Sequence, residues 1–401
     1  MVYVAVMGYG TVGSGVVDVL EENKKSIARR AGDGIEVKRI LHRHDLPGSP
    51  YQKLITHDFA DIEQDADIRV VVETIGGTGA AYEYTKRCLL AGKSVVTSNK
   101  ELVATKGQEL LSIAREKNVN YLFEASVGGG IPIIRPITQC LAANEITEIY
   151  GILNGTTNYI LTQMIRCGKS FDDALHEAQD MGYAERDPSA DVLGFDACRK
   201  ICILADLCFG KNIEPEGIHT EGITEITFED VVLAKRAGFR IKLLGRALLR
   251  EDGRIHVYVA PHLLREDSLL AGVSGVMNGI VVHGNAIGEA MFYGAGAGKR
   301  PTASAVVADV IDAAKHLKAR KFLDWAETEK DFVAPTEEFA CRWYVRAAVA
   351  PAEVRAVFGD VEFIADSTEG ECAFLTAPIT CAEAEKKAKI AKSLSCIRIL
   401  D

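Results

Sequence analysis

The chain has 401 residues, 48% of them hydrophobic and 25% charged, with a formal net charge of −10 at pH 7. This length allows two or three domains, and the acidic balance argues against binding of nucleic acid through a basic face. No apolar run is long enough for a membrane span, and the chain starts in a strand-like run without a signal core. We therefore expect a cytoplasmic protein. The ten cysteines form no CxxC or Cys/His metal spacing.

The first third of the chain predicts a dinucleotide-binding unit. The apolar run Val2–Met7 predicts a strand, and it leads into Gly8, Gly10 and Gly13 in the pattern G-x-G-x-x-G, with a helix from about Val12. The first glycine permits a tight turn, the second lets the backbone approach a pyrophosphate, and the third allows close packing of helix on strand. N–H groups at the helix start would bind the phosphates.

Strands and helices continue to alternate up to about residue 125. We expect strands at Ile35–Leu41, Arg69–Thr74, Ser94–Thr97 and Tyr121–Glu124, and helices at Ala80–Leu90 and Leu102–Glu116. This order predicts an α/β fold of Rossmann type, a doubly wound parallel sheet covered on both faces. Ligands of such a sheet bind beyond the carboxyl ends of its strands. The residues expected there are Gly76, Gly77, Ser98, Asn99, Lys100 and Gly128–Gly130.

The end of the second expected strand bears on the choice between NAD and NADP. An acid there favours NAD, whereas a nearby arginine accommodates the 2′-phosphate of NADP. Arg43 stands where that phosphate would lie and Lys53 adds positive potential, while Asp45 is the opposing acid. We predict NADP, with NAD as the alternative.

The segment Gly182–Pro188, together with Asp196 and Lys200, carries the most chemistry. We expect one helix from Asp187 through Leu204, on which Asp196 and Lys200 share a face because they are four residues apart. With Glu185 just before this helix, two carboxylates and an amine would hold a zwitterionic substrate and move a proton. Taken alone, Asp196 and Lys200 are more often a surface ion pair, and the nucleotide-binding unit upstream favours the catalytic interpretation.

The rest of the chain predicts two further domains. Residues 146–300 predict an α+β substrate and dimerisation domain, and the helix expected at Pro301–Leu317 returns to the first domain, which then comprises 1–145 and about 301–320. Residues 338–401 follow the order β-α-β-β-α-β. The elements expected there are strands Arg342–Ala348, Glu362–Asp366, Cys372–Thr376 and Cys396–Leu400, and helices Ala352–Phe358 and Cys381–Leu394.

Together these motifs resemble the homoserine dehydrogenase family along nearly the whole chain. The matching segments are Gly8–Gly15, 98–101, 124–132, 151–161, Gly182–Pro188, Gly194–Lys200, Tyr293–Gly298 and 301–304. The resemblance implies reversible, NAD(P)-dependent reduction of L-aspartate 4-semialdehyde to L-homoserine in threonine, methionine and isoleucine biosynthesis. It also implies a homodimer or a higher homo-oligomer, with no nucleic-acid or membrane partner.

The resemblance also implies roles for single residues. Lys200 matches the general acid/base, and Lys100 matches a second amine near the reacting oxygen and the nicotinamide. The implied substrate-binding residues are Glu185 and Asp196, which hold the ammonium group, with Gly182 and Tyr183. The implied cofactor contacts are Gly8, Gly10, Thr11, Val12, Gly13, Arg43, Lys100 and Gly298. A monovalent-cation site, usually sodium and built largely from backbone carbonyls, matches Glu124, Val127, Gly129 and Ile131.

The last unit resembles an ACT-type regulatory domain, which in this family often responds to threonine. Amino-acid-binding ACT modules usually have a Pro-Gly turn before the first helix, whereas this chain has Pro351 followed by Ala352. Without that glycine, close approach of the backbone to a ligand is less available. We therefore predict weak or absent threonine inhibition and a role in assembly.

Two other functions compete with this interpretation. A catalytically silent NADP-binding regulatory protein with an ACT-type module need not keep Lys100, Glu185, Asp196 and Lys200 together. A phosphorylating aspartate-semialdehyde dehydrogenase needs a cysteine nucleophile, and no cysteine falls at an expected strand-end loop of the nucleotide-binding domain. Both are ranked below homoserine dehydrogenase.

Overall fold

A computed structural model of the chain describes residues 1–365 and 370–400. The chain divides into two compact units. Unit 1 comprises Met1–Glu145, Cys202–Pro215 and Gly294–Glu329, and unit 2 comprises Ile146–Ile201, Glu216–Tyr293 and Lys330–Asp401. Within the described ranges, no helix is both long and apolar enough to cross a membrane.

Unit 1 is built on a six-stranded sheet in the order β3-β2-β1-β4-β5-β6, in which all neighbours pair in parallel. Most residues of the central strands are apolar and buried, as expected for a sheet covered on both faces. This confirms the predicted doubly wound sheet. The strands are β1 (Val2–Met7), β2 (Ile35–Leu41), β3 (Ile55–Thr56), β4 (Ile68–Glu73), β5 (Ser94–Thr97) and β6 (Tyr121–Leu122).

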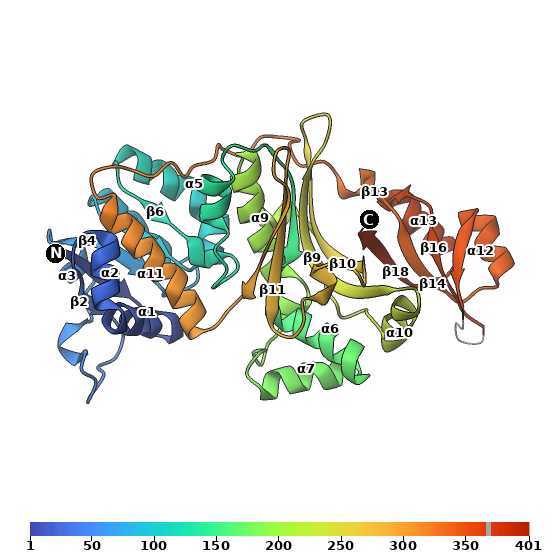
Figure 1. Cartoon of the computed structure of the whole chain (residues 1–401), viewed down its shortest axis with the longest axis horizontal. Helices are drawn as coiled ribbons and strands as arrows, with labels where there is room; N and C mark the ends of the chain where they lie inside the picture. Colours follow the sequence, from blue (N-terminus) through green and yellow to red (C-terminus); the bar gives the residue numbers. More distant parts are fainter. Residues whose placement is uncertain (366–369, 401) are drawn as a thin grey trace. The chain divides into compact units, whose positions relative to one another are not determined.

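The helices of unit 1 include one that comes from far along the chain. Helix α11 (Lys299–Lys315), orange in Figure 1, lies beside α1 (Thr11–Glu22) and α2 (Lys24–Ala31). The contact is close because Gly15 lacks a Cβ, which would lie 2.9 Å from the Lys299 carbonyl oxygen. The remaining helices are α3 (Ala60–Glu63), α4 (Ala80–Leu90) and α5 (Lys100–Glu116).

The helix expected from Asp187 through Leu204 is interrupted. The structure has a short α8 (Ser189–Val192) and a separate α9 (Phe195–Phe209), with Gly194 between them at φ +88°. A Cβ on Gly194 would lie 3.0 Å from the Thr220 side chain, so the break also permits close packing of β8. The division into units falls within α9, and residues 202–215 join unit 1 together with 294–329, so unit 1 is larger than the expected first domain.

Unit 2 is built on a ten-stranded sheet in the order β12-β11-β7-β9-β10-β18-β14-β16-β15, with β8 pairing to β10. A separate two-stranded sheet joins β13 (Ala340–Cys341) to β17 (Ile379–Thr380). The ten strands are β7 (Ile146–Ile152), β8 (His219–Thr220), β9 (Phe239–Leu249), β10 (Ile255–Arg265), β11 (Met277–Gly284), β12 (Gly288–Ala295), β14 (Trp343–Ala347), β15 (Val361–Ile364), β16 (Cys372–Thr376) and β18 (Ser393–Leu400).

The helices of unit 2 pack on this sheet. Helix α6 (Gly155–Cys167) contacts β9 and β11 and carries α7 (Phe171–Asp180) on its other side, both green in Figure 1. Asn154 caps α6 because its side chain accepts a hydrogen bond from the Thr157 N–H. The other helices are α10 (Phe228–Arg236), α12 (Pro351–Phe358) and α13 (Cys381–Ile390).

The C-terminal elements have the expected β-α-β-β-α-β order, but their four strands extend the sheet of unit 2. Strand β18 pairs in parallel with β10, with His262 opposite Arg398. The two parts share one core, in which Tyr258 of β10 packs in the same cluster as Trp343. Residues 338–401 therefore belong to unit 2 and do not form a compact unit of their own. The expected end of one strand, Asp366, lies outside the described residues.

Candidate active site

The turn between β1 and α1 fits a bound pyrophosphate. Gly8 has φ +94°, and a Cβ on Gly13 would lie 1.9 Å from the Gly8 carbonyl oxygen, so both positions require glycine. A Cβ on Gly10 would meet nothing within 4 Å, which leaves open space beside the start of α1 at Thr11 and Val12. No side chain of the described residues caps this helix, so its first N–H groups remain available for phosphate oxygens.

Arg43 and Asp45, the two residues after β2 that bear on cofactor choice, have different surroundings. Arg43 is exposed just beyond the strand. The Asp45 carboxylate instead accepts a hydrogen bond of 2.9 Å from Gln52 Nε2 and lies 3.3 Å from His57 Nε2. These contacts lower the pKa of Asp45, with the Gln52 hydrogen bond contributing most. Asp45 is therefore engaged by the segment that follows, while Arg43 faces solvent.

Asp196 and Lys200 form a buried pair, with 3% and 7% of their surfaces exposed. Lys200 Nζ donates hydrogen bonds of 2.7 Å to Asp196 Oδ2 and to the Leu153 carbonyl oxygen. The interpretation as a surface ion pair is therefore wrong. A buried amine between a carboxylate and a carbonyl oxygen is held in one place, as proton transfer to a substrate requires.

Asn154 connects this pair to a third carboxylate. Its Nδ2 donates hydrogen bonds of 2.7 Å to both Asp196 Oδ2 and Asp191 Oδ1. Its Oδ1 accepts from the Thr157 N–H at 2.9 Å, and this cap fixes which way the amide points. Burial, and then the charge of Asp196, raises the pKa of Asp191. The sequence had assigned no role to Asp191 or Asn154, although the order Asn154-Gly155-Thr156 is itself a helix-cap signal.

The expected substrate residues between α7 and α8 are only partly brought to this cluster. The Tyr183 carbonyl oxygen accepts a hydrogen bond of 2.7 Å from Thr156 Oγ1, next to Asn154, and Gly182 has φ +74°. Glu185 is exposed, and in the described chain its carboxylate makes no hydrogen bond or ion pair. The structure thus ties Tyr183 to α6 and leaves the Glu185 carboxylate in solvent.

Two further predicted residues stand at helix starts in unit 1. Lys100 is the first residue of α5, at the carboxyl end of β5, and is half-buried. It follows Asn99, whose side chain caps the helix and donates 2.7 Å to the Gly77 carbonyl oxygen. Gly298, with φ +118°, precedes α11. Lys100 belongs to unit 1 and Lys200 to unit 2.

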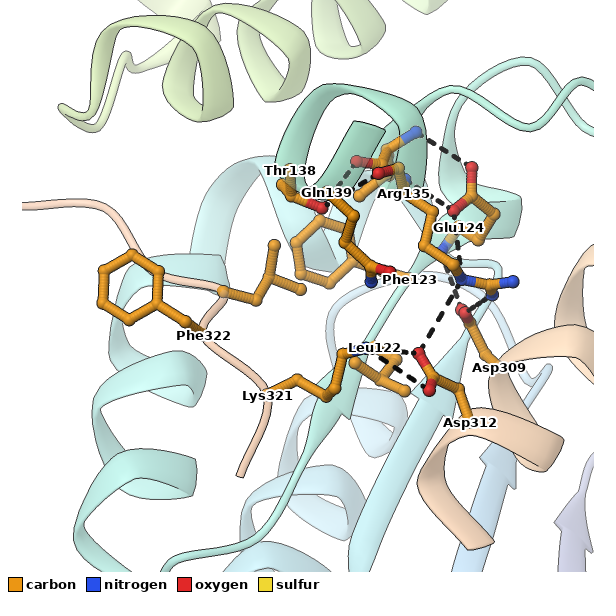
Figure 2. Close-up of a pocket in the computed structure, with 12 residues that line it drawn as sticks. Leu122, Phe123, Glu124, Arg135, Thr138, Gln139, Asp309, Asp312, Lys321 and Phe322 are labelled. Carbon is orange, nitrogen blue, oxygen red and sulfur yellow. Dashed lines mark hydrogen bonds and ion pairs between the residues drawn. The ribbon is translucent and has the colours of Figure 1, made fainter. Parts of the chain in front are cut away.

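The predicted cation residues lie beside a buried charge network. Glu124 accepts hydrogen bonds from the N–H groups of Ile133 at 2.7 Å, Ile134 at 2.9 Å and Arg135 at 2.9 Å. Asp309 accepts from the Glu124 N–H at 2.8 Å and pairs with Arg135, as Figure 2 shows. Burial raises the pKa of Asp309 to about 7. The Glu124 carboxylate thus already accepts three backbone hydrogen bonds.

A cation at this place would therefore be held by backbone carbonyls. The described residues contain no group of three or more His, Cys, Asp or Glu side chains that could hold a metal ion. Gly129 has φ +54°, and a Cβ there would lie 2.4 Å from the Gly296 carbonyl oxygen, so the segment through Val127 and Ile131 folds tightly. The residues present do not fit a carboxylate cage, and a site built from backbone carbonyls stays a prediction.

Comparison with known families covers most of the chain. The model described as "Homoserine dehydrogenase, NAD binding domain" matches residues 8–124, and the model described as "Homoserine dehydrogenase" matches residues 132–311. The homoserine dehydrogenase of Pseudomonas aeruginosa is 48% identical over 312 residues, which cover 78% of this chain and 72% of that protein. That of Helicobacter pylori is 42% identical over 361 residues, covering 90% and 84%.

Solved structures agree with these matches. A homoserine dehydrogenase from Thiobacillus denitrificans superposes with a TM-score of 0.90 at 38% identity and covers 100% of this chain and 98% of that chain. A hyperthermophilic archaeal homoserine dehydrogenase in complex with NADPH has a TM-score of 0.67 at 30% identity, covering 78% of this chain and 97% of that chain.

Proposed function

Because the chain belongs to the homoserine dehydrogenase family of NAD(P)-dependent oxidoreductases, we propose that it interconverts L-aspartate 4-semialdehyde and L-homoserine, with Lys200 as the general acid/base. The observation that carries this assignment is the burial of the Lys200 amine, held at 2.7 Å by both Asp196 and the Leu153 carbonyl oxygen. The cluster can orient a polar substrate and exchange one proton with it.

The proton chemistry follows from the charge that develops during reduction. A bound nicotinamide supplies or accepts the hydride. As the aldehyde is reduced, negative charge grows on its oxygen, and the ammonium of Lys200 stabilises that charge and donates the proton. Lys100 is the second amine near this oxygen. Asp196 and Glu185 hold the substrate ammonium, Gly182 and Tyr183 are further substrate contacts, and Asp191 lies beside Asp196 through Asn154.

For the cofactor, NADP is favoured. Gly8, Gly10 and Gly13, with the N–H groups of Thr11 and Val12, bind the pyrophosphate, and Gly298 contributes from the start of α11. Arg43 is free to meet a 2′-phosphate because it faces solvent, whereas Asp45 is engaged by Gln52 and His57. The archaeal relative in complex with NADPH is consistent with this choice.

The remaining assignments concern ions, assembly and regulation. The backbone carbonyls of Glu124, Val127, Gly129 and Ile131 hold a monovalent cation, sodium first among candidates. The chain assembles as a cytoplasmic homodimer or larger oligomer. The C-terminal ACT-like unit serves assembly, and threonine inhibits weakly or not at all. Initial rates with and without sodium test the cation, and initial rates with and without threonine test the inhibition. Inhibition by micromolar threonine would contradict the prediction that threonine inhibits weakly or not at all.

The central test is Lys200→Ala. We expect the variant to lose turnover by a factor of roughly 10²–10⁴, the range of general acid–base catalysis, or more. Its cofactor affinity should stay close to that of the wild type, because the dinucleotide turn lies in unit 1. The measurements are absorbance at 340 nm with L-homoserine and NADP, and cofactor binding by calorimetry. The control is Lys211→Ala, which changes a partly exposed lysine after α9 that pairs with Glu329. Near-wild-type kcat in Lys200→Ala would remove the assigned role.

A further inference from the structure

Three segments of unit 1 meet beside the glycine-rich turn. Tyr9, which lies between Gly8 and Gly10, packs edge-on against His42 after β2 and against Tyr51, with ring centres 6.2 Å and 6.4 Å apart. Tyr51 precedes a 3₁₀ turn that leads into β3. These ring contacts keep the loop after β2 next to the turn where we place the cofactor pyrophosphate. The polar side chains of the loop therefore lie on the adenosine side of the proposed cofactor site.

Asp45 is held within this loop by two partners, although 65% of its side chain is exposed. Its Oδ1 accepts a hydrogen bond of 2.9 Å from Gln52 Nε2 and lies 3.3 Å from His57 Nε2. The Gln52 amide is itself fixed, because its Oε1 accepts from the Leu46 N–H at 2.5 Å. The carboxylate is thus tied to the chain that follows β2, where it is not free to accept a ribose hydroxyl.

His57 is oriented from its other side by the backbone. Its Nδ1 lies 2.7 Å from the His42 carbonyl oxygen. A carbonyl oxygen and a carboxylate can only accept, so each ring nitrogen makes its hydrogen bond only when it carries a proton. The imidazolium therefore makes both contacts, whereas the neutral ring makes one. The hydrogen bond to His42 raises the pKa of His57 most, burial lowers it, and Asp45 adds to the rise.

The neighbouring titratable groups leave His57 as the cation that neutralises Asp45. Burial, and then the charges of His44 and His57, lower the pKa of His42, so His42 loses its proton before His57 as the pH rises. Asp58 and Asp61 accept hydrogen bonds within their own turn. The remaining charged or titratable side chains along these segments are Arg43, Lys53, Tyr9 and Tyr51. Both tyrosines stay neutral, because burial raises the pKa of each.

We propose that His57 is a positioning residue that sets the cofactor choice by holding Asp45 away from the adenosine ribose. While His57 is charged, its pair with Asp45 is neutral, and Arg43 and Lys53 leave a net positive site for a 2′-phosphate. Once His57 is neutral, Asp45 is released, repels the phosphate of NADP and accepts the 2′-hydroxyl of NAD. The role of His57 rests on the proposed binding of NAD(P) at the glycine-rich turn.

The preference should therefore shift from NADP toward NAD as the pH rises. Because the pKa of His57 is raised, its pair with Asp45 is complete at low pH and is lost as the pH rises through that pKa. The second pKa of a phosphate ester is near 6, so between about pH 7 and about pH 9 the 2′-phosphate keeps its charge. Solvated charges interact weakly, so the released carboxylate should weaken NADP binding about fivefold.

The experiment titrates the full-length protein with NADP and with NAD by calorimetry at both ends of this pH range. At the lower pH, His57→Gln, which keeps an amide donor without the charge, should bind NADP about fivefold more weakly and NAD about threefold more tightly than the wild type. Raising the pH should change the wild type in the same way and leave His57→Gln unchanged. His44→Gln, the matched control, should keep the pH dependence of the wild type.

Binding of NAD isolates the part played by Asp45. NAD lacks the phosphate that a charged histidine would attract directly, so its affinity changes only if the carboxylate is released. In Asp45→Asn, NAD affinity should depend neither on pH nor on an added His57→Gln substitution.

Several results would overturn the proposal. Equal NAD affinity in the wild type and His57→Gln shows that His57 does not hold Asp45 from the ribose. A pH dependence of NAD affinity that persists in Asp45→Asn, or disappears in His44→Gln, assigns the effect to another group. Wild-type preference for NAD at both pH values contradicts the choice of NADP, and the comparison with His57→Gln still decides the role of His57. Binding of neither cofactor removes both. If His57→Gln fails to fold, the wild type and Asp45→Asn across the pH range decide.

Discussion

Lys200 and Lys242 are both buried amines of unit 2, but their surroundings differ. Lys200 donates to a carboxylate, whereas Lys242 Nζ donates to two neutral oxygens, Asn158 Oδ1 at 2.9 Å and the Val273 carbonyl oxygen at 2.5 Å. Burial, and then the charges of Arg240 and Arg166, lower the pKa of Lys242 to about 7. A neutral amine has two N–H donors, which equals the number of acceptors here.

Lys242→Met should remove a pH dependence of stability. In the unfolded chain the lysine titrates near 10.5, so above pH 7 the unfolded state binds more protons and the free energy of unfolding rises with pH. The group contributes a rise of roughly 3 kcal/mol between about pH 6.5 and about pH 9.5. Urea unfolding of wild type and variant across this range measures it, with Lys386→Met as the exposed control. A constant difference between wild type and variant would show that native Lys242 stays charged.

Single residues were predictable where the chemistry is local. The glycine spacing identified Gly8, Gly10 and Gly13 because a tight turn and a close helix leave no other residue type. The burial of the Lys200 pair was not predictable from its four-residue spacing, because the groups that fix it, Leu153 and Asn154, lie more than 40 positions earlier and meet it only in the fold. Arg398 of β18 likewise pairs with Glu221 from a distant segment.

At the scale of elements, two glycines of the β1–α1 turn are needed for different reasons: Gly13 for folding and Gly10 for cofactor binding. A Cβ at Gly13 would lie 1.9 Å from the Gly8 carbonyl oxygen, whereas one at Gly10 would meet nothing. We expect Gly13→Ala to lower the thermal midpoint by several degrees, since helix and strand must separate. Gly10→Ala should fold normally yet raise KM for NADP about tenfold or more, because the methyl group takes the place of the pyrophosphate.

These two variants are compared by thermal unfolding without cofactor and by initial rates with it. Gly32→Ala is a poor control because φ is +78° there, and Ser14→Ala, on the same helix, serves better. A Gly10→Ala variant that binds NADP as the wild type does would mean that the cofactor lies away from this turn.

The break between α8 and α9 shows where the sequence pattern of an element fails. The apolar spacing from Val192 to Leu204 is continuous and predicts one helix. The chain instead leaves the helix at Gly194, in a backbone region that glycine adopts easily, and the packing of Thr220 against that position requires it. A glycine within a helical pattern was the only local signal, and its meaning depends on a segment 26 positions later.

For the whole molecule, the sheet of unit 2 explains why domain limits were the least predictable feature. The order β-α-β-β-α-β was readable from alternating patterns, but β18 continues the sheet through β10. The pairing depends on which edge is free after β9 and β10 form, and no local pattern encodes that. The solved chain of the archaeal relative, which is covered to 97%, matches only 78% of this chain.

One buried ion pair links the C-terminal elements to the rest of unit 2 and offers a test of this continuity. Arg346 of β14 donates 2.9 Å to Asp230 of α10, with 7% and 0% of the two side chains exposed. Breaking such a pair costs about 3–5 kcal/mol because the other charge stays buried. Arg346→Met should therefore destabilise unit 2 as one cooperative body, and Arg342→Met, whose partner Glu362 is exposed, should cost below about 1 kcal/mol.

Tryptophan fluorescence makes this measurable, because the two tryptophans fall in different units. Trp343 reports the C-terminal elements once Trp325 of unit 1 is changed to phenylalanine. In that background, Arg346→Met should lower the urea midpoint of the Trp343 signal, and activity should be lost over the same urea range, because β10 belongs to both parts of the sheet. If activity survives after the Trp343 signal has changed, the C-terminal elements unfold alone and the sheet is not one cooperative structure.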